Sequence, residues 1–465
     1  MSSGQRTERS VEIQPVVEYR LYKARFWGVT GIVILNIVGG MNWTYFGPIS
    51  TEMVNDFGIT LDQNNWLGNI IALTYIVFAP FVPVLRKRLG LRTTCMIGTA
   101  TLILASWVRY AGTARSLPVN GAYALLIIGQ FFSALSQAIF QIIGPIYSQT
   151  WFDLQGRTTA TMVMSIANPI GGALGQLISP IPTHARPAIL ILGIVCTVFS
   201  PVVFLIKSEP PTPPTYAGSQ PTPHMLTMLR ALIGKQPLND HHASLDSRMT
   251  IRERIDFVIL TLLFGTLVAA TNAYSIQSSQ LLEPYGYSEN TAGFMGAALL
   301  LSGIVAAIVT APLFDRVMTH HLAFTARIFC PVIAALWLSL IWAVKPNNTA
   351  ALYAIFVLIG VCSVSMLPVG LELGCELTRS ADGSSAILWW SGNLLGIIFV
   401  LVEAALRAGV DARPPQNMHR ALIFQGAFVV VACSTVLLLR GKQRRREMDV
   451  QKFEEYKAGG AQLGS

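Results

Sequence analysis

Long apolar runs separated by short polar loops dominate the pattern of hydrophobic and polar positions along the chain. Twelve of these runs are long enough to cross about 30 Å of hydrocarbon as helices. They lie at residues 25–47, 65–85, 93–113, 119–146, 158–181, 187–206, 256–281, 291–313, 322–344, 349–373, 383–406 and 419–439. This pattern predicts an all-α membrane protein with twelve transmembrane helices in two six-helix bundles.

The polar segments set the expected domain boundaries. We expect a tail at 1–24, a first bundle at 25–206, a linker at 207–255, a second bundle at 256–440 and a basic tail at 441–465. The linker begins with a proline-rich stretch that is typical of extended chain. Its apolar residues from Met225 to Ile233 recur at helical spacing and predict a short amphipathic helix on the membrane surface.

Composition supports the membrane class, because 52% of the residues are hydrophobic and only 12% are charged, against roughly 25% charged in soluble domains. Lysine and arginine gather in the tails, the linker and alternate loops. This distribution predicts cytoplasmic termini and explains the net charge of +9 without a nucleic-acid partner. The plasma membrane and an internal membrane both remain open, and we expect a monomer.

Cysteine and histidine usage argues against a metal site, a cofactor or an enzyme. All six cysteines lie in apolar runs, and no CxxC or His/Cys cluster occurs. We also find no nucleophile–base pair within the runs. We therefore expect a lipid-embedded protein that acts on a small molecule without changing it chemically.

The stretch from Asn36 to Pro48, N-I-V-G-G-M-N-W-T-Y-F-G-P, breaks the first apolar run. Polar side chains such as Asn42 are costly if they face lipid, and Trp43 adds a large aromatic face beside paired glycines. One interpretation is a small-residue packing seam with an interfacial tryptophan. The other is a helix that lines a central cavity, with Trp43 in its binding wall.

Polar and aromatic residues also cluster in the fourth, seventh and eleventh runs. Because the first and seventh helices of repeated bundles are equivalent, these clusters predict a midplane site between the repeats. Single glutamines in membranes also form ordinary interhelical hydrogen bonds. An aromatic, amide-rich site without an acid suits an organic cation held by ring faces, or a flat apolar molecule. The candidate binding residues are Asn42, Trp43, Gln137, Tyr274, Gln277, Trp390 and Asn393.

The few charged residues within the runs, and one proline, carry further expectations. We expect Arg109 to extend toward the outer surface and Glu403 to pair with Arg407 at i,i+4 spacing. Pro169 and Gly171 interrupt the fifth run, where they predict either a hinge between the bundles or a static kink.

Two loops carry motifs that resemble those of the major facilitator superfamily. The first, L-R-K-R-L-G-L-R at 85–92, contains Arg88 and Arg92 but lacks the usual acidic residue; the second, P-L-F-D-R at 312–316, contains Asp315 and Arg316. The resemblance implies the two-bundle fold of that superfamily, alternating access, and a conformational role for these four charged residues.

More specifically, the chain resembles the feline leukaemia virus subgroup C receptor-related family. The matching stretches are N-W-T-Y-F-G-P-I (42–49), N-W-L-G-N-I-I-A-L-T-Y (65–75), G-L-R-T (90–93), G-Q-F-F-S-A-L-S-Q (129–137), W-F…R…A-T…N-P-I-G (151–171) and E-L-T…G-N-L-L-G-I-I-F (376–399). The resemblance implies transport of choline or ethanolamine, and haem export has also been proposed for the family. It further implies that Trp43 and Tyr274 enclose an ammonium group beside Gln137, with Asn393 in place of a second glutamine.

Together these observations predict a secondary transporter for a small organic cation of the choline type. Haem or another porphyrin is an alternative substrate, although no histidine or cysteine is expected at cavity depth to bind its iron. A membrane receptor or sensor that binds without transporting is the alternative from another class.

Overall fold

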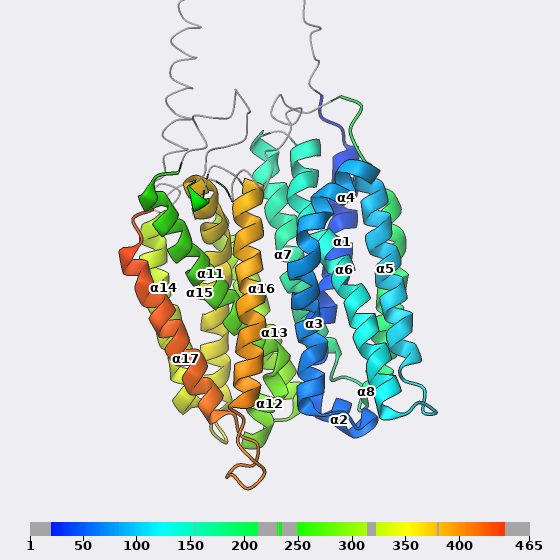
Figure 1. The fold of residues 1–465 in the computed structure, drawn as a ribbon, viewed down its shortest axis with the longest axis vertical. Coiled ribbons are helices and arrows are strands. Elements are labelled where there is room, and N and C mark those ends of the chain that lie inside the picture. The colour runs from blue at the N-terminus through cyan, green and yellow to red at the C-terminus, as the bar shows by residue number, and fades with distance from the viewer. Residues whose placement is uncertain are drawn as a thin grey trace, which may run out of the picture.

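The computed structural model describes residues 20–152, 154–212, 230, 232–234, 249–313, 322–378 and 381–441. These residues form two groups of long helices that stand side by side (Figure 1). The first group contains α1 (Ala24–Thr44), α2 (Ser50–Phe57), α3 (Leu61–Phe78), η1 (Ala79–Phe81), α4 (Val82–Leu89), α5 (Leu91–Ala111), α6 (Val119–Trp151), α7 (Leu154–Ile178), α8 (Ala185–Phe199) and η2 (Ser200–Leu205). The second contains α11 (Ile251–Ile276), α12 (Ser278–Leu282), η3 (Glu283–Tyr285), α13 (Glu289–Leu313), α14 (Leu322–Ala343), α15 (Thr349–Thr378), α16 (Ala381–Ala405), α17 (His419–Ser434) and η5 (Thr435–Leu438).

The helices match the predicted all-α architecture. Eleven helical stretches of the described chain are long and apolar enough to cross a membrane. α7 occupies the place of the predicted fifth span but falls outside this set, because Asn168, Gln176 and its glycines dilute its apolar residues. The predicted surface helix at 225–233 lies mostly outside the described residues.

Large apolar side chains on the outer faces of the helices indicate where lipid would contact the protein. Trp27, Val309, Trp342 and Val431 are all exposed, although water would make such exposure unfavourable. In a bilayer the same surface meets hydrocarbon. The long helices therefore expose apolar side chains outward and keep most of their polar side chains inside.

Glycines bring α1 and α7 into close contact. A Cβ atom at Gly40 would overlap the backbone of Asn168, and one at Gly171 would overlap the carbonyl oxygen of Ile37. At Gly175 the added carbon would lie 2.6 Å from the carbonyl oxygen of Met41. These glycines form a small-residue packing seam within the first bundle, and Pro169 lies inside α7 beside it.

The two ends of the described chain lie at one end of the molecule, which we call the terminal face (Figure 1). The short helices α2 and α12 lie at the other end, which we call the distal face. Threonine capping boxes define where two of the long helices begin: Thr60 with Gln63 starts α3 at the distal face, and Thr250 with Glu253 starts α11 at the terminal face.

Candidate functional site

The two bundles meet along two pairs of long helices, α7 with α13 and α3 with α16. On α13, Gly296 leaves room for the amide of Gln176, which an added Cβ would overlap, and Gly293 lies against the Gln176 carbonyl oxygen. Both polar atoms of the Gln176 amide are buried without a hydrogen-bond partner. The interface between the bundles thus contains polar groups as well as close backbone contacts.

Trp43 lies at this interface. A Cβ atom added at Gly172 of α7 would lie 3.1 Å from Cζ2 of Trp43 and 3.3 Å from Cδ1 of Leu300 on α13. The six-membered ring of Trp43 therefore lies beside Gly172 and near Leu300. The side chain is half-buried, and its indole Nε1 is buried without a hydrogen-bond partner. Trp43 therefore presents an aromatic ring between the bundles, and its indole N–H is free to donate a hydrogen bond.

Gln137 and Asn69 are two further buried amides of the first bundle with atoms that form no hydrogen bond. Gln137 lies on α6 and is buried, and its Oε1 accepts no hydrogen bond. Asn69 lies on α3, and neither atom of its amide has a partner. A buried amide without a hydrogen-bond partner costs the folded protein about 1–3 kcal/mol of stability. Such an atom can bind a polar ligand without first breaking a hydrogen bond within the protein.

On α16 the structure selects Trp389, rather than the predicted Trp390, as the ring that faces the first bundle. Trp389 contacts Phe264 edge to face at 5.4 Å and packs against apolar clusters of both bundles. Trp390 is 41% exposed, on the same helix face as the exposed residue Leu401. Consecutive helical residues point about 100° apart, so the adjacent tryptophans cannot share one surface.

Asn393 lies one turn beyond Trp389 and is half-buried. Its Nδ2 donates to the Trp389 carbonyl oxygen at 2.9 Å. Its amide nitrogen is therefore occupied by its own helix in this conformation, and contact between Asn393 and a substrate stays a prediction.

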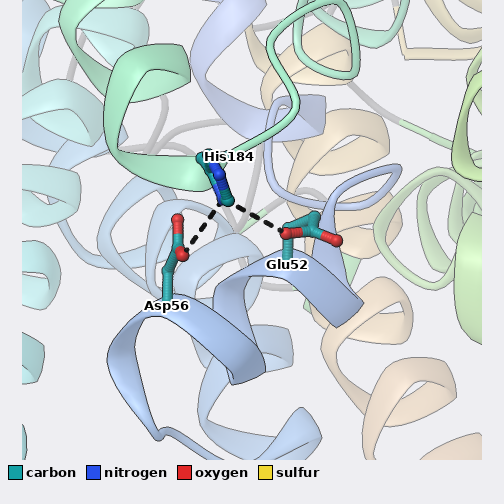
Figure 2. A group of neighbouring side chains, drawn as sticks. All are labelled: Glu52, Asp56 and His184. Atoms are coloured by element: carbon teal, nitrogen blue, oxygen red, sulfur yellow. Dashed lines mark ion pairs between the residues drawn. The ribbon is translucent and has the colours of Figure 1, made fainter.

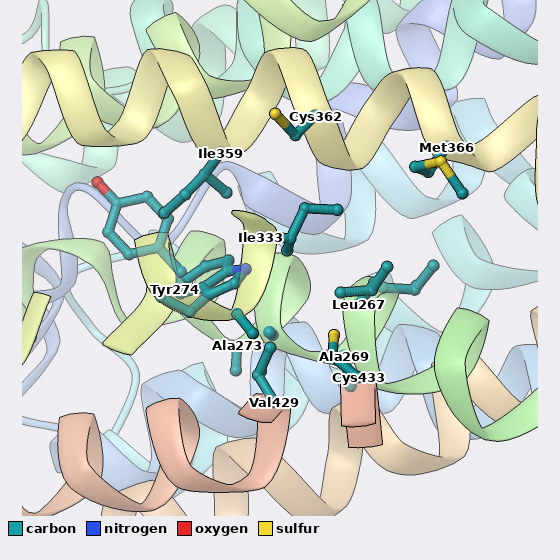
Figure 3. Close-up of a cluster of buried hydrophobic side chains, with 14 of the residues drawn as sticks. Leu267, Ala269, Ala273, Tyr274, Ile333, Ile359, Cys362, Met366, Val429 and Cys433 are labelled. Atoms are coloured by element: carbon teal, nitrogen blue, oxygen red, sulfur yellow. The ribbon is translucent and has the colours of Figure 1, made fainter. Parts of the chain in front are cut away.

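Tyr274 has different surroundings from Trp43. Its ring stacks on Phe356 of α15 at 4.3 Å and meets Trp337 of α14 edge to face at 6.5 Å. Figure 3 shows it among apolar side chains from α14, α15 and α17 of the second bundle, and it is 0% exposed. The structure therefore does not bring Tyr274 and Trp43 together as the two walls of one aromatic site.

Asn42 and Gln277 hold helices together. The Nδ2 of Asn42 donates to the Val38 carbonyl oxygen at 2.8 Å and lies 3.9 Å from Sγ of Cys196 on α8. The Nε2 of Gln277 donates to the Val400 carbonyl oxygen on α16 at 2.9 Å. Both amides point into their own bundles, and each keeps one oxygen without a partner.

Hydrogen bonds between the bundles gather at the distal face, where they form what we call the distal gate. Ser50 and Thr51 of α2 bond to Ser279 and Glu283 of the second bundle, and the Glu52 amide donates to Glu289 at 3.3 Å. Three further bonds that cross the interface are Ser279 to Gly47, Gln280 to Asn65 and Arg407 to Asp62. The described structure is therefore closed at its distal face.

Burial shifts the pKa of one carboxyl group of the distal gate. It raises the pKa of Glu283 because the charged carboxylate is poorly solvated there; the hydroxyl of Thr51 opposes the shift, and the negative charge of Glu52 adds to it. Glu289 also lies at the gate, and Arg407 lines a cavity of about 260 Å³ with Glu283. Opening of the gate would hydrate Glu283 and return its pKa toward the ordinary value. Protonation of Glu283 would therefore favour the closed gate, and closure would weaken as the pH rises through the raised pKa.

We expect acidification from about pH 8 to about pH 5 to increase the fraction of molecules with a closed distal gate. Spin labels at the exposed distal positions Arg115 and Asp411, one on each bundle, report this closure as a shorter distance. Glu283→Gln should weaken the pH dependence, because the amide does not titrate. An unchanged pH profile in Glu283→Gln would show that Glu283 does not control the gate.

The predicted conformational residues lie away from the distal gate or outside the described chain. Arg88 at the end of α4 and Arg92 at the start of α5 are exposed, and the Arg92 amide donates to Ser208 Oγ at 3.3 Å. Asp315 and Arg316 lie outside the described residues. A gating role for these four residues, and for Pro169 and Gly171, stays a prediction.

Two charged groups differ from their predicted placement. Arg109 is 1% exposed and turns inward, where its Nη1 donates to Gln130 Oε1, because Gly129 leaves room for its side chain. Arg407 pairs with Asp62 at 2.8 Å instead of Glu403. α16 ends at Ala405, so Arg407 is released from the helical spacing that would place it beside Glu403.

Comparison with known proteins identifies the family. The family model described as Major Facilitator Superfamily matches residues 32–401. The chain belongs to the Major Facilitator Superfamily. As a member, it is a multi-pass membrane protein that transports small molecules, rather than an enzyme.

Relatives of this Major Facilitator Superfamily protein include named choline transporters. The choline/ethanolamine transporter FLVCR2 of Homo sapiens is 23% identical, over 92% of this chain and 80% of its own length. The choline/ethanolamine transporter flvcr2a of Danio rerio is 24% identical, over 86% of this chain and 84% of its own length. Solute carrier family 49 member A3 of Danio rerio is 23% identical, over 95% and 93%. The predicted resemblance to the feline leukaemia virus receptor-related family is confirmed.

Solved transporters share the fold. A bacterial homologue of the human lysosomal transporter Spinster, in an inward-facing and unoccupied conformation, superposes with a TM-score of 0.66 at 13% identity, over 90% of this chain and 98% of its own. A D-xylose-proton symporter superposes with a TM-score of 0.65 at 11% identity, over 90% of this chain and 99% of its own. At these identities the similarity shows the fold alone, and it confirms the predicted superfamily architecture.

Proposed function

We propose that this protein transports a small organic cation of the choline type, with Trp43 as one wall of the binding site. The observation that carries the proposal is the position of Trp43 between the bundles, half-buried, with its indole nitrogen unpaired. The face of a tryptophan ring attracts a quaternary ammonium group. The relatives named choline/ethanolamine transporters support this choice of cation.

The buried amides explain how the same site could recognise the rest of the molecule. Oε1 of Gln137 has no hydrogen bond and can accept one from a substrate hydroxyl. Tyr274 contributes in this proposal only after the second bundle rearranges, because Phe356 covers its ring in the described conformation. The described histidines, His184 and His419, are exposed near helix ends, which favours an organic cation over haem.

We propose that the terminal face is cytoplasmic, which follows from the distribution of lysine and arginine. The closed distal gate then makes the described conformation inward-facing. Exchange between this state and one with an open distal gate would move the substrate across the membrane. One chain supplies both bundles, so the proposed transport unit is a monomer.

The test is uptake of labelled choline by sealed vesicles that contain the purified protein. Wild-type vesicles should accumulate choline in a saturable manner, and Trp43→Ala should lower the uptake at least tenfold because the ring face is lost. Trp43→Phe should keep part of the uptake, since it keeps an aromatic face. Trp390→Ala is the matched control, because that ring lies on the outer surface.

The possible outcomes separate the alternatives. No uptake above protein-free vesicles would refute the choline assignment. Saturable binding without accumulation would indicate a sensor instead of a transporter. Equal uptake by wild type and Trp43→Ala would place the site elsewhere.

A further inference from the structure

Three side chains of the first bundle at the distal face, next to the distal gate, form a set of potential metal-binding atoms. Glu52 and Asp56 lie one turn apart on α2, and His184 immediately precedes α8 (Figure 2). Nδ1 of His184 lies 3.5 Å from Oδ1 of Asp56 and 4.0 Å from Oε2 of Glu52. One ligand atom from each of the three residues lies within 4.8 Å of the other two.

We propose that Glu52, Asp56 and His184 bind a divalent transition-metal ion of the Zn²⁺ type. With bonds of about 2.0–2.2 Å, the ligand atoms of a tetrahedral zinc site lie roughly 3.4 Å apart. The spacing to Asp56 matches this value, and rotation of the Glu52 and His184 side chains would close the remaining gap. One imidazole nitrogen with two carboxylates suits Zn²⁺ better than Mg²⁺ or Ca²⁺, which prefer oxygen ligands.

The backbone around Asp56 holds its carboxylate in position for a metal. Oδ2 accepts a hydrogen bond from the amide of Ala185 at 2.8 Å, which leaves Oδ1 directed toward His184. Because Ala185 follows His184, the same bond fixes the start of α8 relative to α2. Hydrogen bonds of this kind orient the ligands of established metal sites.

The nearby arginine does not neutralise the two carboxylates. The guanidinium of Arg186 donates to the carbonyl oxygens of Asp56 and Thr113 and lies 4.8 Å from the ring centre of Phe57. Its charge is therefore directed at backbone carbonyls and an aromatic ring. The Arg186 guanidinium therefore leaves the side-chain oxygens of Glu52 and Asp56 accessible to a cation.

The site is open to solvent on one side. Asp56 and His184 line a cavity of about 370 Å³ together with Arg115 and Arg186, and this space leaves room for a water molecule as the fourth zinc ligand. α2 also carries Ser50 and Thr51 of the distal gate. A bound ion would therefore fix α2 to the start of α8, on the first-bundle side of the gate. This proposal does not depend on which solute is transported.

The test is zinc titration of the purified full-length protein by calorimetry at about pH 7.5, where free histidine is neutral. Wild type should bind one Zn²⁺ and unfold at a higher temperature when zinc is present, and Mg²⁺ should have neither effect. His184→Ala and Glu52→Gln should each weaken the affinity at least tenfold. Neither change should disturb packing, since the His184 side chain is 65% exposed and that of Glu52 is 28% exposed.

His419→Ala is the matched control, because this exposed histidine lies at the start of α17, away from the three ligands. It should bind zinc as wild type does. Absence of zinc binding by wild type would overturn the proposal. Equal binding by wild type and His184→Ala would also overturn it, since the zinc would then bind elsewhere.

Discussion

Replacing Gly47 by valine should abolish transport while both bundles stay folded. Gly47 follows α1 and lies against the end of α11 across the interface between the bundles. A Cβ atom there would overlap the carbonyl oxygen of Ser275 and lie 3.1 Å from that of Ile276. Both obstacles are backbone atoms, so no change of side-chain rotamer removes the clash. The bundles must then separate at the distal face, and alternating access loses one of its two states.

Uptake by vesicles and a disulfide trap would test this prediction together. Ser50 and Ser279 face each other through their hydroxyls in the closed gate, so cysteines at both positions should crosslink in the Gly47 protein. The crosslink should fail in Gly47→Val, whatever the solute. Gly39→Ala is the control, since a Cβ there meets no atom within 4 Å. Crosslinking and uptake at wild-type levels in Gly47→Val would contradict the mechanism.

The fold followed from the sequence because hydrophobic runs determine which segments form membrane helices, whatever their neighbours. The paired glycines of the first run were open to two interpretations, and the structure shows that they differ. Gly40 belongs to the packing seam with α7, whereas a Cβ atom added at Gly39 would meet no atom within 4 Å. Trp43, three residues beyond Gly40, lies beside both α7 and α13. Gly40 and Trp43 lie one turn apart on α1 and both contact α7, so the seam and the interface surface are neighbours on one side of the helix.

The candidate site was predicted less completely from the sequence. The position of a residue in the sequence determines the direction in which its side chain leaves its own helix, but not which neighbouring helix it meets. Tyr274 carries the expected aromatic ring, but α14 and α15 surround that ring. Trp390 was the candidate from the sequence, but the rotation of α16 places Trp389 inward and leaves Trp390 exposed. The distal gate was missed for a similar reason: its residues come from loops, short helices and the first turns of α3 and α13, and their contacts depend on how the two bundles dock.

Arg109 shows a further limit, since its placement depends on space that a neighbouring helix provides. Hydropathy locates Arg109 near the end of an apolar run, from which it could extend outward. Gly129 on α6 instead leaves room for the side chain to turn inward, where an added Cβ would overlap Arg109 Cγ. Gln130, the next residue, supplies the acceptor. The pattern of one run alone does not contain this information.

Replacing Gln130 by leucine should strongly destabilise the first bundle. Oε1 of Gln130 accepts from buried Arg109, and its Nε2 donates to the carbonyl oxygens of Asn42 at 3.1 Å and Leu67 at 3.0 Å. No carboxylate forms an ion pair with Arg109 among the described residues, and its Nε and Nη2 already lack partners. Leucine would leave the cation without its acceptor, at a cost of about 3–5 kcal/mol.

Thermal unfolding of the purified protein measures this effect, with Gln141→Leu as the control. Gln141 is a half-buried amide on the same helix, and its replacement should change the unfolding temperature little. Arg109→Met combined with Gln130→Leu should be more stable than Gln130→Leu alone, because removing the charge removes the group that lost its partner. If the double variant is no more stable than the single one, the loss in Gln130→Leu comes from packing. In that case Arg109 would be tolerated in the core without Gln130. The hydrogen bond between Arg109 and Gln130 would then not account for the association of α1, α5 and α6.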